Sequence, residues 1–274
     1  MTTQPTLDTV AVLGGGVMGE ALLSGLLRAG RHPDNLLVAE RLPERAHWLT
    51  ERYGVEAVAS IDAAKRAETL VIVVKPQDMG TLLDEVGEHV RPGTLVVSLA
   101  AGITTAYVEA RLPAGTAVVR VMPNTPALVD EGMAAISPGA HCDDGHLGQV
   151  EAMLRAVGRV VRVPEKQQDA VTAISGSGPA YLFYVVEAMI EAGVLLGLSR
   201  ATATELSVQT LVGAGKMLRE TGQHPSVLRE NVTSPGGTTV AALRELDDHR
   251  VRAAFLTAIE AARDRSHALA SGSD

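Results

Sequence analysis

A glycine-rich loop is the first feature of the sequence that could do chemistry. The residues Gly14-Gly15-Gly16-Val17-Met18-Gly19 follow the apolar run 9–13 and precede the helix-like segment 20–23. In a G-x-G-x-x-G loop the first glycine allows a tight turn, the second lets the backbone approach a pyrophosphate, and the third lets the helix pack closely on the strand. The flanking elements favour dinucleotide binding over a purely structural glycine turn. We expect cofactor contacts from Gly14, Gly16, Val17, Met18 and Gly19.

Charged residues at the end of the next expected strand bear on the choice of dinucleotide. Glu40 lies 21 residues beyond Gly19, where a carboxylate accepts hydrogen bonds from a ribose 2′-hydroxyl and favours NAD. Arg41 and Arg45 favour NADP instead, because arginine suits a 2′-phosphate. The alternative is a solvated arginine pair beside a surface glutamate. NAD and NADP both stay open, with Glu40 and Arg41 as candidate cofactor residues.

Three further loops follow expected buried strands. Lys75-Pro76 comes directly after the run 69–74, the loop 98–102 has small residues that would admit a nicotinamide ring, and Asn124 lies in a turn bracketed by two prolines. Open α/β sheets bind ligands at the carboxyl ends of their strands, so the common position favours a cofactor role. Each loop taken alone is more often structural. The candidate cofactor residues here are Val74, Lys75, Pro76, Ser98, Ala100 and Asn124.

Two stretches rich in glycine and hydroxyl groups open helices in the second half of the chain. They are Ser-Gly-Ser-Gly-Pro at 175–179 and Val-Thr-Ser-Pro-Gly-Gly-Thr-Thr at 232–239. Backbone N–H groups at a helix start point outward and could hold a small anion such as a carboxylate. The alternative is ordinary capping of a helix by serine and threonine.

Several other chemistries lack support. The eight histidines show no metal-ligand spacing such as H-E-x-x-H, and the residues around Cys142 are better explained as a turn, so we expect no metal. Cys142 has no basic neighbour in sequence that would make it a nucleophile. Neither a G-x-S-x-G elbow nor a P-loop lysine motif occurs.

Length and charge narrow the classes of partner. The chain has 274 residues, enough for about two domains. Its net charge is −8 and it has no run of Lys or Arg, so we expect no nucleic acid or anionic membrane as a partner. The longest uncharged stretches, 170–186 and 92–108, fall short of the roughly 20 apolar residues of a membrane span. A single cysteine and a polar start without signal-peptide features predict a cytoplasmic protein.

The elements that must position these residues change character along the chain. Short β-branched runs alternate with helix-length segments up to Val163, which predicts a doubly wound, mostly parallel α/β sheet. Only helical patterns follow, so we expect a Rossmann domain over 1–164 and a helical domain over 165–274. The expected strands are 9–13, 36–40, 69–74, 94–99, 117–122, 133–137 and 159–163. The expected helices of the second half are 180–196, 200–221, 225–231, 239–247 and 251–270.

The helices of the second half are unusually apolar. The segment 180–198 has only Glu187 and Glu191 as charged residues, and the segment 207–215 has none. A helix that is apolar around most of its circumference must be buried on most sides, and pairing with a second copy of the chain would bury it. The alternative is a well-filled monomer core.

Taken together, these motifs resemble the pyrroline-5-carboxylate reductase family. The resemblance covers nearly the whole chain, and the run 231–239 is the most specific motif on which it rests. The other motifs that support the resemblance are residues 14–19, 74–77, 98–103, 122–126 and 175–181. It implies a Rossmann domain followed by an all-α dimerisation domain, and a homodimer through the C-terminal helices that is often assembled into a larger ring such as a decamer. The implied reaction is hydride transfer from NADPH, with NADH as the alternative, to 1-pyrroline-5-carboxylate, giving L-proline in the last step of proline synthesis.

The resemblance also implies roles for particular residues. The substrate carboxylate would lie on Ser234, Gly236, Gly237 and Thr238, and Thr239 would hydrogen-bond the ring nitrogen. Thr239 and Lys75 are the catalytic candidates. Glu40 stands where many family members have a small or hydroxyl residue, which leaves the cofactor preference open.

Three other interpretations compete for the same residues. A β-hydroxyacid dehydrogenase would need a catalytic lysine on the first long helix after the linker, and the segment 180–196 has none. A nucleotide-sensing protein would not need the anion loop 234–239. A reductase of the same fold that acts on another cyclic imino acid is harder to exclude than these two, because the ring beyond the carboxylate is read by shape.

Overall fold

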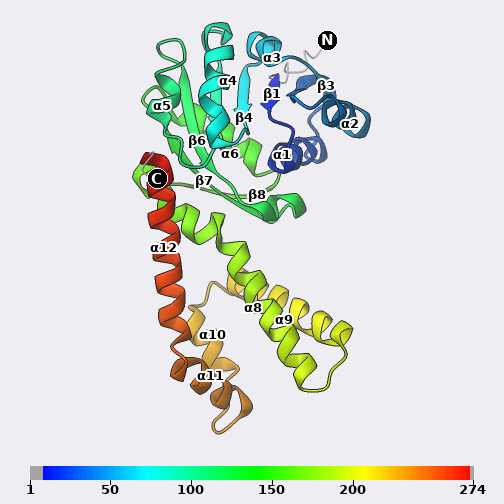
Figure 1. Ribbon diagram of the computed structural model, residues 1–274, viewed down its shortest axis with the longest axis vertical. Helices are drawn as coiled ribbons and strands as arrows, with labels where there is room; N and C mark the ends of the chain where they lie inside the picture. Colours follow the sequence, from blue (N-terminus) through cyan, green and yellow to red (C-terminus); the bar gives the residue numbers. More distant parts are fainter. Residues whose placement is uncertain (1–8, 272–274) are drawn as a thin grey trace. The chain divides into compact units, whose positions relative to one another are not determined.

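The computed structural model describes residues 9–271, which divide into two compact units (Figure 1). The sheet unit contains residues 9–177 and 262–271, and the helical unit contains residues 178–261. A Rossmann-type α/β unit and an all-helical unit were both predicted, and this fold class is confirmed. The predicted domain boundary near residue 164 stays a prediction.

The sheet unit is built on an eight-stranded sheet of order β3-β2-β1-β4-β5-β6-β7-β8. All neighbouring strands pair in parallel except β6 and β7, which are antiparallel. The seven expected strands are confirmed with ends within two residues, and the short edge strand β3 was missed. The strands are β1 (Val10–Leu13), β2 (Leu36–Ala39), β3 (Glu56–Ala57), β4 (Thr69–Ile72), β5 (Leu95–Ser98), β6 (Ala117–Met122), β7 (Gly132–Pro138) and β8 (Gly158–Arg162).

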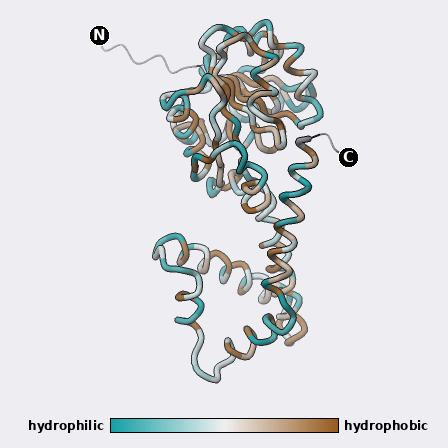
Figure 2. Tube along the Cα trace, turned by 90° about the vertical axis from the view of Figure 1, so that its left-hand side faces the viewer, coloured by the Kyte–Doolittle hydropathy of each residue, from teal (hydrophilic) through white to brown (hydrophobic). Residues whose placement is uncertain are grey.

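Helices cover both faces of this sheet, which is why its central strands are almost continuously apolar (brown in Figure 2). One core cluster packs the strands against α1 (Val17–Arg28), α2 (Pro43–Tyr53) and α6 (Asp144–Leu154). The other packs them against α3 (Ser60–Arg66), α4 (Met79–Val86) and α5 (Thr105–Glu109). This two-sided cover leaves the carboxyl ends of the parallel strands as the edge for a ligand.

The sheet unit continues past β8 through a short helical connection. It consists of η5 (Glu165–Gln167), α7 (Gln168–Val171) and η6 (Thr172–Gly176). The end of α12 (Val251–Ser271) belongs to this unit as well, and Ser266 Oγ donates a 2.8 Å hydrogen bond to Asp169 Oδ1.

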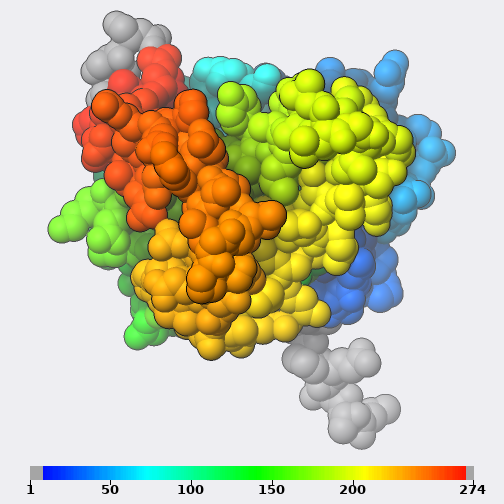
Figure 3. All heavy atoms as spheres, turned by 90° about the horizontal axis from the view of Figure 1, so that it is seen from below, coloured from blue at the N-terminus to red at the C-terminus, as the bar shows by residue number. Residues whose placement is uncertain are grey.

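The helical unit has almost no core of its own. It contains α8 (Gly178–Leu195), α9 (Arg200–Thr221), α10 (Pro225–Asn231), α11 (Thr238–Asp248) and the first half of α12. Within residues 178–261 only Ala203 and Ser207 are buried. In Figure 3 the side chains of α9, α10 and α11 lie open on the face that is seen from below. The five expected helices are confirmed with ends within two residues.

Large apolar side chains make up much of this exposed surface. Phe183 is 67% exposed, Tyr184 74%, Leu195 88% and Leu196 85%. By length and composition alone, the helical run Glu165–Leu195 could also cross a membrane. The sequence analysis considered only the uncharged stretch 170–186, whereas the helical run continues to Leu195 and includes Glu187 and Glu191.

Candidate active site

The parallel strands end together at one edge of the sheet. Leu13 pairs with Ile72, Ile72 with Ser98 and Ser98 with Arg120, so these four residues mark the carboxyl edge. A hollow of about 290 Å³ opens there. It is lined by the glycine-rich loop, the end of β2 and the segment that follows β4, including Gly14, Gly16, Glu40, Arg41, Val74, Lys75 and Gln77. The structure therefore brings six of the thirteen sequence-predicted cofactor residues into this hollow, and Ser98, Ala100 and Asn124 are not among its lining residues.

The glycine-rich loop fits a pyrophosphate. Gly14 has φ of +109°, and a Cβ there would lie 2.7 Å from the carbonyl oxygen of Val73. A Cβ on Gly19 would overlap the carbonyl oxygen of Gly14, whereas a Cβ on Gly16 would meet nothing within 4 Å. The open side of the loop is thus at Gly16, which is the N-cap of α1 and carries no side-chain cap. The first amides of the 12-residue helix α1 are free to face an anion.

Two charged side chains clamp the peptide of Gly15. Glu40 Oε2 accepts a 2.8 Å hydrogen bond from Gly15 N, and Arg45 Nε donates a 2.8 Å hydrogen bond to Gly15 O. The second oxygen of Glu40 accepts from Leu42 N at 3.0 Å. Glu40 therefore orders the loop as well as lining the hollow.

Arg45 is held in place by neighbours on α1 and α2. It forms an ion pair with Glu20, and its guanidinium carbon lies 4.5 Å from the centre of the Trp48 ring. Tyr53 donates a 2.7 Å hydrogen bond to Glu20. Partial burial raises the pKa of Glu20, but the hydrogen bonds from Tyr53 and Arg45 outweigh it and leave that pKa below its ordinary value. Arg45 is committed to the loop, so Arg41, 78% exposed and 3.5 Å from Asp78, is the better placed arginine for a 2′-phosphate.

The other strand-end candidates have mixed positions. Lys75 is exposed and lines the hollow. The Ser98 side chain is buried, and its hydroxyl has no hydrogen-bond partner within the described chain. Ala100 is also buried. A ligand at the 98–102 loop would therefore contact the backbone of the loop rather than these two side chains. The Asn124 side chain accepts from Met133 N at 2.8 Å and donates to Ser175 O at 3.1 Å. The side-chain amide of Asn124 therefore connects β7 to η6. A cofactor contact from Asn124 stays a prediction.

The helical unit carries an anion-binding geometry at the start of α11. Gly236 has φ of +65°, and Gly237, the N-cap, provides no side chain to cap the helix. The hydroxyls of Ser234, Thr238 and Thr239 form no hydrogen bond in the part of the chain that the structure describes. Free amides and free hydroxyls at the start of an 11-residue helix suit a carboxylate.

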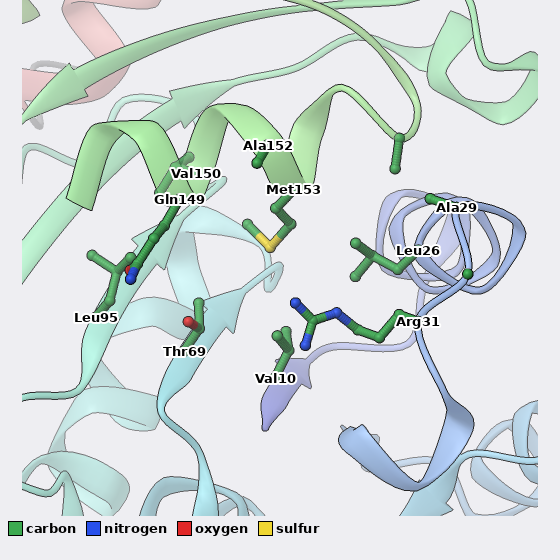
Figure 4. A pocket seen from close by; sticks show the side chains of 12 residues that line it. Val10, Leu26, Ala29, Arg31, Thr69, Leu95, Gln149, Val150, Ala152 and Met153 are labelled. Atoms are coloured by element: carbon green, nitrogen blue, oxygen red, sulfur yellow. The ribbon is translucent and has the colours of Figure 1, made fainter. Parts of the chain in front are cut away.

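Two other features do not contribute to a site. A second hollow, of about 320 Å³, lies at the amino ends of the strands, opposite to the edge where such sheets bind ligands (Figure 4). Cys142 donates to Val118 O, and burial raises the pKa of its thiol, which disfavours the nucleophilic thiolate. The described residues hold no cluster of three His, Cys, Asp or Glu side chains that could bind a metal.

Comparisons with known proteins agree with this geometry. Residues 9–102 match the family described as NADP oxidoreductase coenzyme F420-dependent, and residues 165–269 match the family described as pyrroline-5-carboxylate reductase dimerisation. The fold and these matches define a two-unit oxidoreductase of the Rossmann class.

Relatives over the whole length narrow this class. A pyrroline-5-carboxylate reductase of Corynebacterium melassecola is 48% identical over 96% of this chain and 99% of its own length. The chain belongs to the pyrroline-5-carboxylate reductase family. The solved reductase of Coxiella burnetii is 36% identical with a TM-score of 0.90, covering 94% of this chain and 97% of that one. The Plasmodium falciparum enzyme, solved with NADP bound, is 29% identical with a TM-score of 0.86, covering 96% and 98%.

Proposed function

We propose that this chain reduces the C=N bond of 1-pyrroline-5-carboxylate with NADPH and forms L-proline. The observation that carries the proposal is the uncapped start of α11 with the free hydroxyls of Ser234, Thr238 and Thr239, in a chain whose other unit has a dinucleotide loop. An anion site made of amides and hydroxyls suits a small carboxylate substrate that must be held without chemical attack.

The residues of the sheet unit have distinct tasks in this proposal. The amides at the start of α1 hold the pyrophosphate, Arg41 binds the 2′-phosphate, and Lys75 lines the same hollow. NADPH supplies the hydride for the imine carbon. The chain contributes position and electrostatics, and the backbone of the 98–102 loop sets how closely the nicotinamide ring can approach.

The residues of the helical unit hold the substrate. Ser234, Gly236, Gly237 and Thr238 bind the carboxylate, and the Thr239 hydroxyl hydrogen-bonds the ring nitrogen. This nitrogen gains electron density as the C=N bond is reduced, so a hydrogen bond to it is stronger in the transition state than in the ground state.

Thr239→Ala tests the contact with the ring nitrogen. We expect kcat/KM for the imine to fall by about 10- to 100-fold, the value of one hydrogen bond to a group that gains charge. The dissociation constant of NADPH should stay within about twofold, because the dinucleotide loop lies in the other unit. Thr221→Ala, an exposed threonine at the end of α9, is the control. An equal loss of NADPH affinity in Thr239→Ala would show a structural role instead.

Glu40→Gln tests the choice between the two dinucleotides. A carboxylate repels a 2′-phosphate, so its removal should raise the ratio of kcat/KM with NADPH to that with NADH by about tenfold. Glutamine keeps an oxygen that can accept from Gly15 N, which preserves the loop. Glu51→Gln, the same substitution on the exposed side of α2, is the control. An unchanged ratio would place Glu40 away from the ribose.

We propose that a homodimer forms through the C-terminal helices and that dimers assemble into a ring such as a decamer. The support is the exposed apolar surface of the helical unit, which a second copy would bury, so that no membrane is needed to cover it. We also propose a cytoplasmic location, which the single cysteine supports.

The substrate ring can be tested directly. NADPH oxidation should proceed at least about tenfold faster with the five-membered imine than with 1-piperideine-6-carboxylate, since one extra methylene in a shaped pocket costs about 1–3 kcal/mol. Turnover with the six-membered ring alone would assign the chain to another cyclic imino acid.

A further inference from the structure

A buried cation lies at the carboxyl edge of the sheet, outside the residues assigned so far. Arg120 is the fourth of the six residues of β6 and is level with the carboxyl end of β5. Its side chain is only 6% exposed, while its neighbours Val119 and Val121 are apolar. Its Cα is paired with Ser98 on one side and with Ser137 on the other. Burying a guanidinium costs free energy unless the group is paired, so an apolar residue at this position would stabilise a purely structural strand better.

The partner of this cation is Glu165, the first residue of η5. Glu165 Oε1 lies 3.4 Å from Arg120 Nη1 and accepts a 2.8 Å hydrogen bond from Thr105 N. Glu165 Oε2 accepts a 2.8 Å hydrogen bond from Thr105 Oγ1. One carboxylate thus joins the connection after β8, the strand β6 and the first turn of α5, which lies beside β6 (Figure 1).

The first turn of α5 ends the loop from Leu99 to Thr104. This loop follows Ser98 directly, and its residue Ala100 is a candidate for contact with the nicotinamide. The side chains of Ser98 and Ala100 are buried, so the backbone of the loop faces any ligand at this edge. Where that backbone lies depends on its anchor at Thr105, and Thr105 is held by Glu165.

We propose that Glu165 and Arg120 are positioning residues for hydride transfer. They fix the 99–104 loop, and through it the approach of the nicotinamide ring to the imine. This inference rests on the proposed reductase function. A shift of about 1 Å in a reacting group can cost about 100-fold in rate. The contacts of Glu165 with Thr105 and Arg120 therefore affect the chemical step more than the dinucleotide affinity, which the glycine-rich loop supplies.

Glu165→Gln tests this proposal. The substitution leaves Arg120 without a charged partner and replaces one acceptor oxygen with a donor. We expect kcat to fall at least about tenfold and the deuterium isotope effect with 4-deuterated NADPH to become larger, with the dissociation constant of NADPH within about twofold. Amide exchange of the peptide 99–108 should become faster with and without NADPH.

The matched control is Glu56→Gln. Glu56 forms an ion pair with Arg66 through two hydrogen bonds at the β3 edge of the same unit. Loss of thermal stability in both variants, with kcat and the isotope effect of Glu165→Gln equal to those of the control, would overturn the proposal. If Glu165→Gln does not fold, Thr105→Val removes only the bond to Oε2, and a kcat unchanged within twofold would overturn it equally.

The exchange measurement separates this inference from the reductase function. If the wild type binds NADPH but reduces no imine, the proposed function fails and the positioning role for hydride transfer fails with it. In that case, an amide exchange rate of peptide 99–108 in Glu165→Gln equal to that in Glu56→Gln would show that Glu165 does not hold the loop either.

Discussion

Gly19→Ala is expected to abolish measurable binding of NADPH and NADH. The new Cβ would overlap the carbonyl oxygen of Gly14, a backbone atom that cannot move without opening the turn at the start of the loop. We expect a loss of at least about 100-fold in affinity, measured by titration calorimetry, and a decrease of about 1–3 kcal/mol in the free energy of unfolding, the usual cost of overpacking.

Gly148→Ala is the matched control for this substitution. Gly148 lies within α6, and a Cβ there would meet nothing within 4 Å. The free energy of unfolding should rise by about 0.5–1 kcal/mol because alanine is the better helix former, with dinucleotide affinity unchanged. Wild-type affinity in Gly19→Ala would contradict the role given to the loop.

Phe183→Glu is expected to convert the assembly into monomers. Phe183 is 67% exposed within the chain, in a unit whose only buried residues are Ala203 and Ser207. Burial of a phenylalanine stabilises an interface by about 1.5–3 kcal/mol, and a symmetric dimer contains two copies. The dimer dissociation constant should rise at least about 100-fold, measured by analytical ultracentrifugation.

Lys65→Gln, on the exposed face of α3, is the control because it also changes the net charge by one negative unit. It should leave both the sedimentation behaviour and the activity unchanged. A Phe183→Glu protein that keeps the wild-type assembly would show that α8 is covered by something other than a second copy at this position.

The elements of the fold were largely predictable because their patterns are local. Apolar runs bounded by turn residues marked β1, β4 and β6, and the helical pattern of α9 matched its observed ends at Arg200 and Thr221. The strand β3 was missed because its two residues, Glu56 and Ala57, are exposed and form a strand only by pairing with β2. A pairing of that kind leaves no periodic signal in the sequence.

The hollow at the carboxyl edge of the sheet was predictable in position but not in detail. The glycine spacing located the loop, yet nothing local indicates that Arg45 would bind Gly15 O and Glu20 rather than a phosphate. No sequence pattern indicated that Tyr53 would support the site, since its hydrogen-bond partner Glu20 lies on another helix. Arg120 did carry a signal, a charge inside an otherwise apolar strand, but its partner Glu165 is 45 residues away. Tertiary packing decides the direction of each of these side chains.

The central claim is that the chain transfers hydride from a nicotinamide dinucleotide to 1-pyrroline-5-carboxylate. The most direct test measures the loss of NADPH and of NADH side by side after this imine is added, and quantifies the proline formed. We expect one proline for each dinucleotide oxidised, with the ratio of kcat/KM for the two dinucleotides reporting the balance between Arg41 and Glu40. A protein that binds NADPH but forms no proline with either dinucleotide would contradict the account.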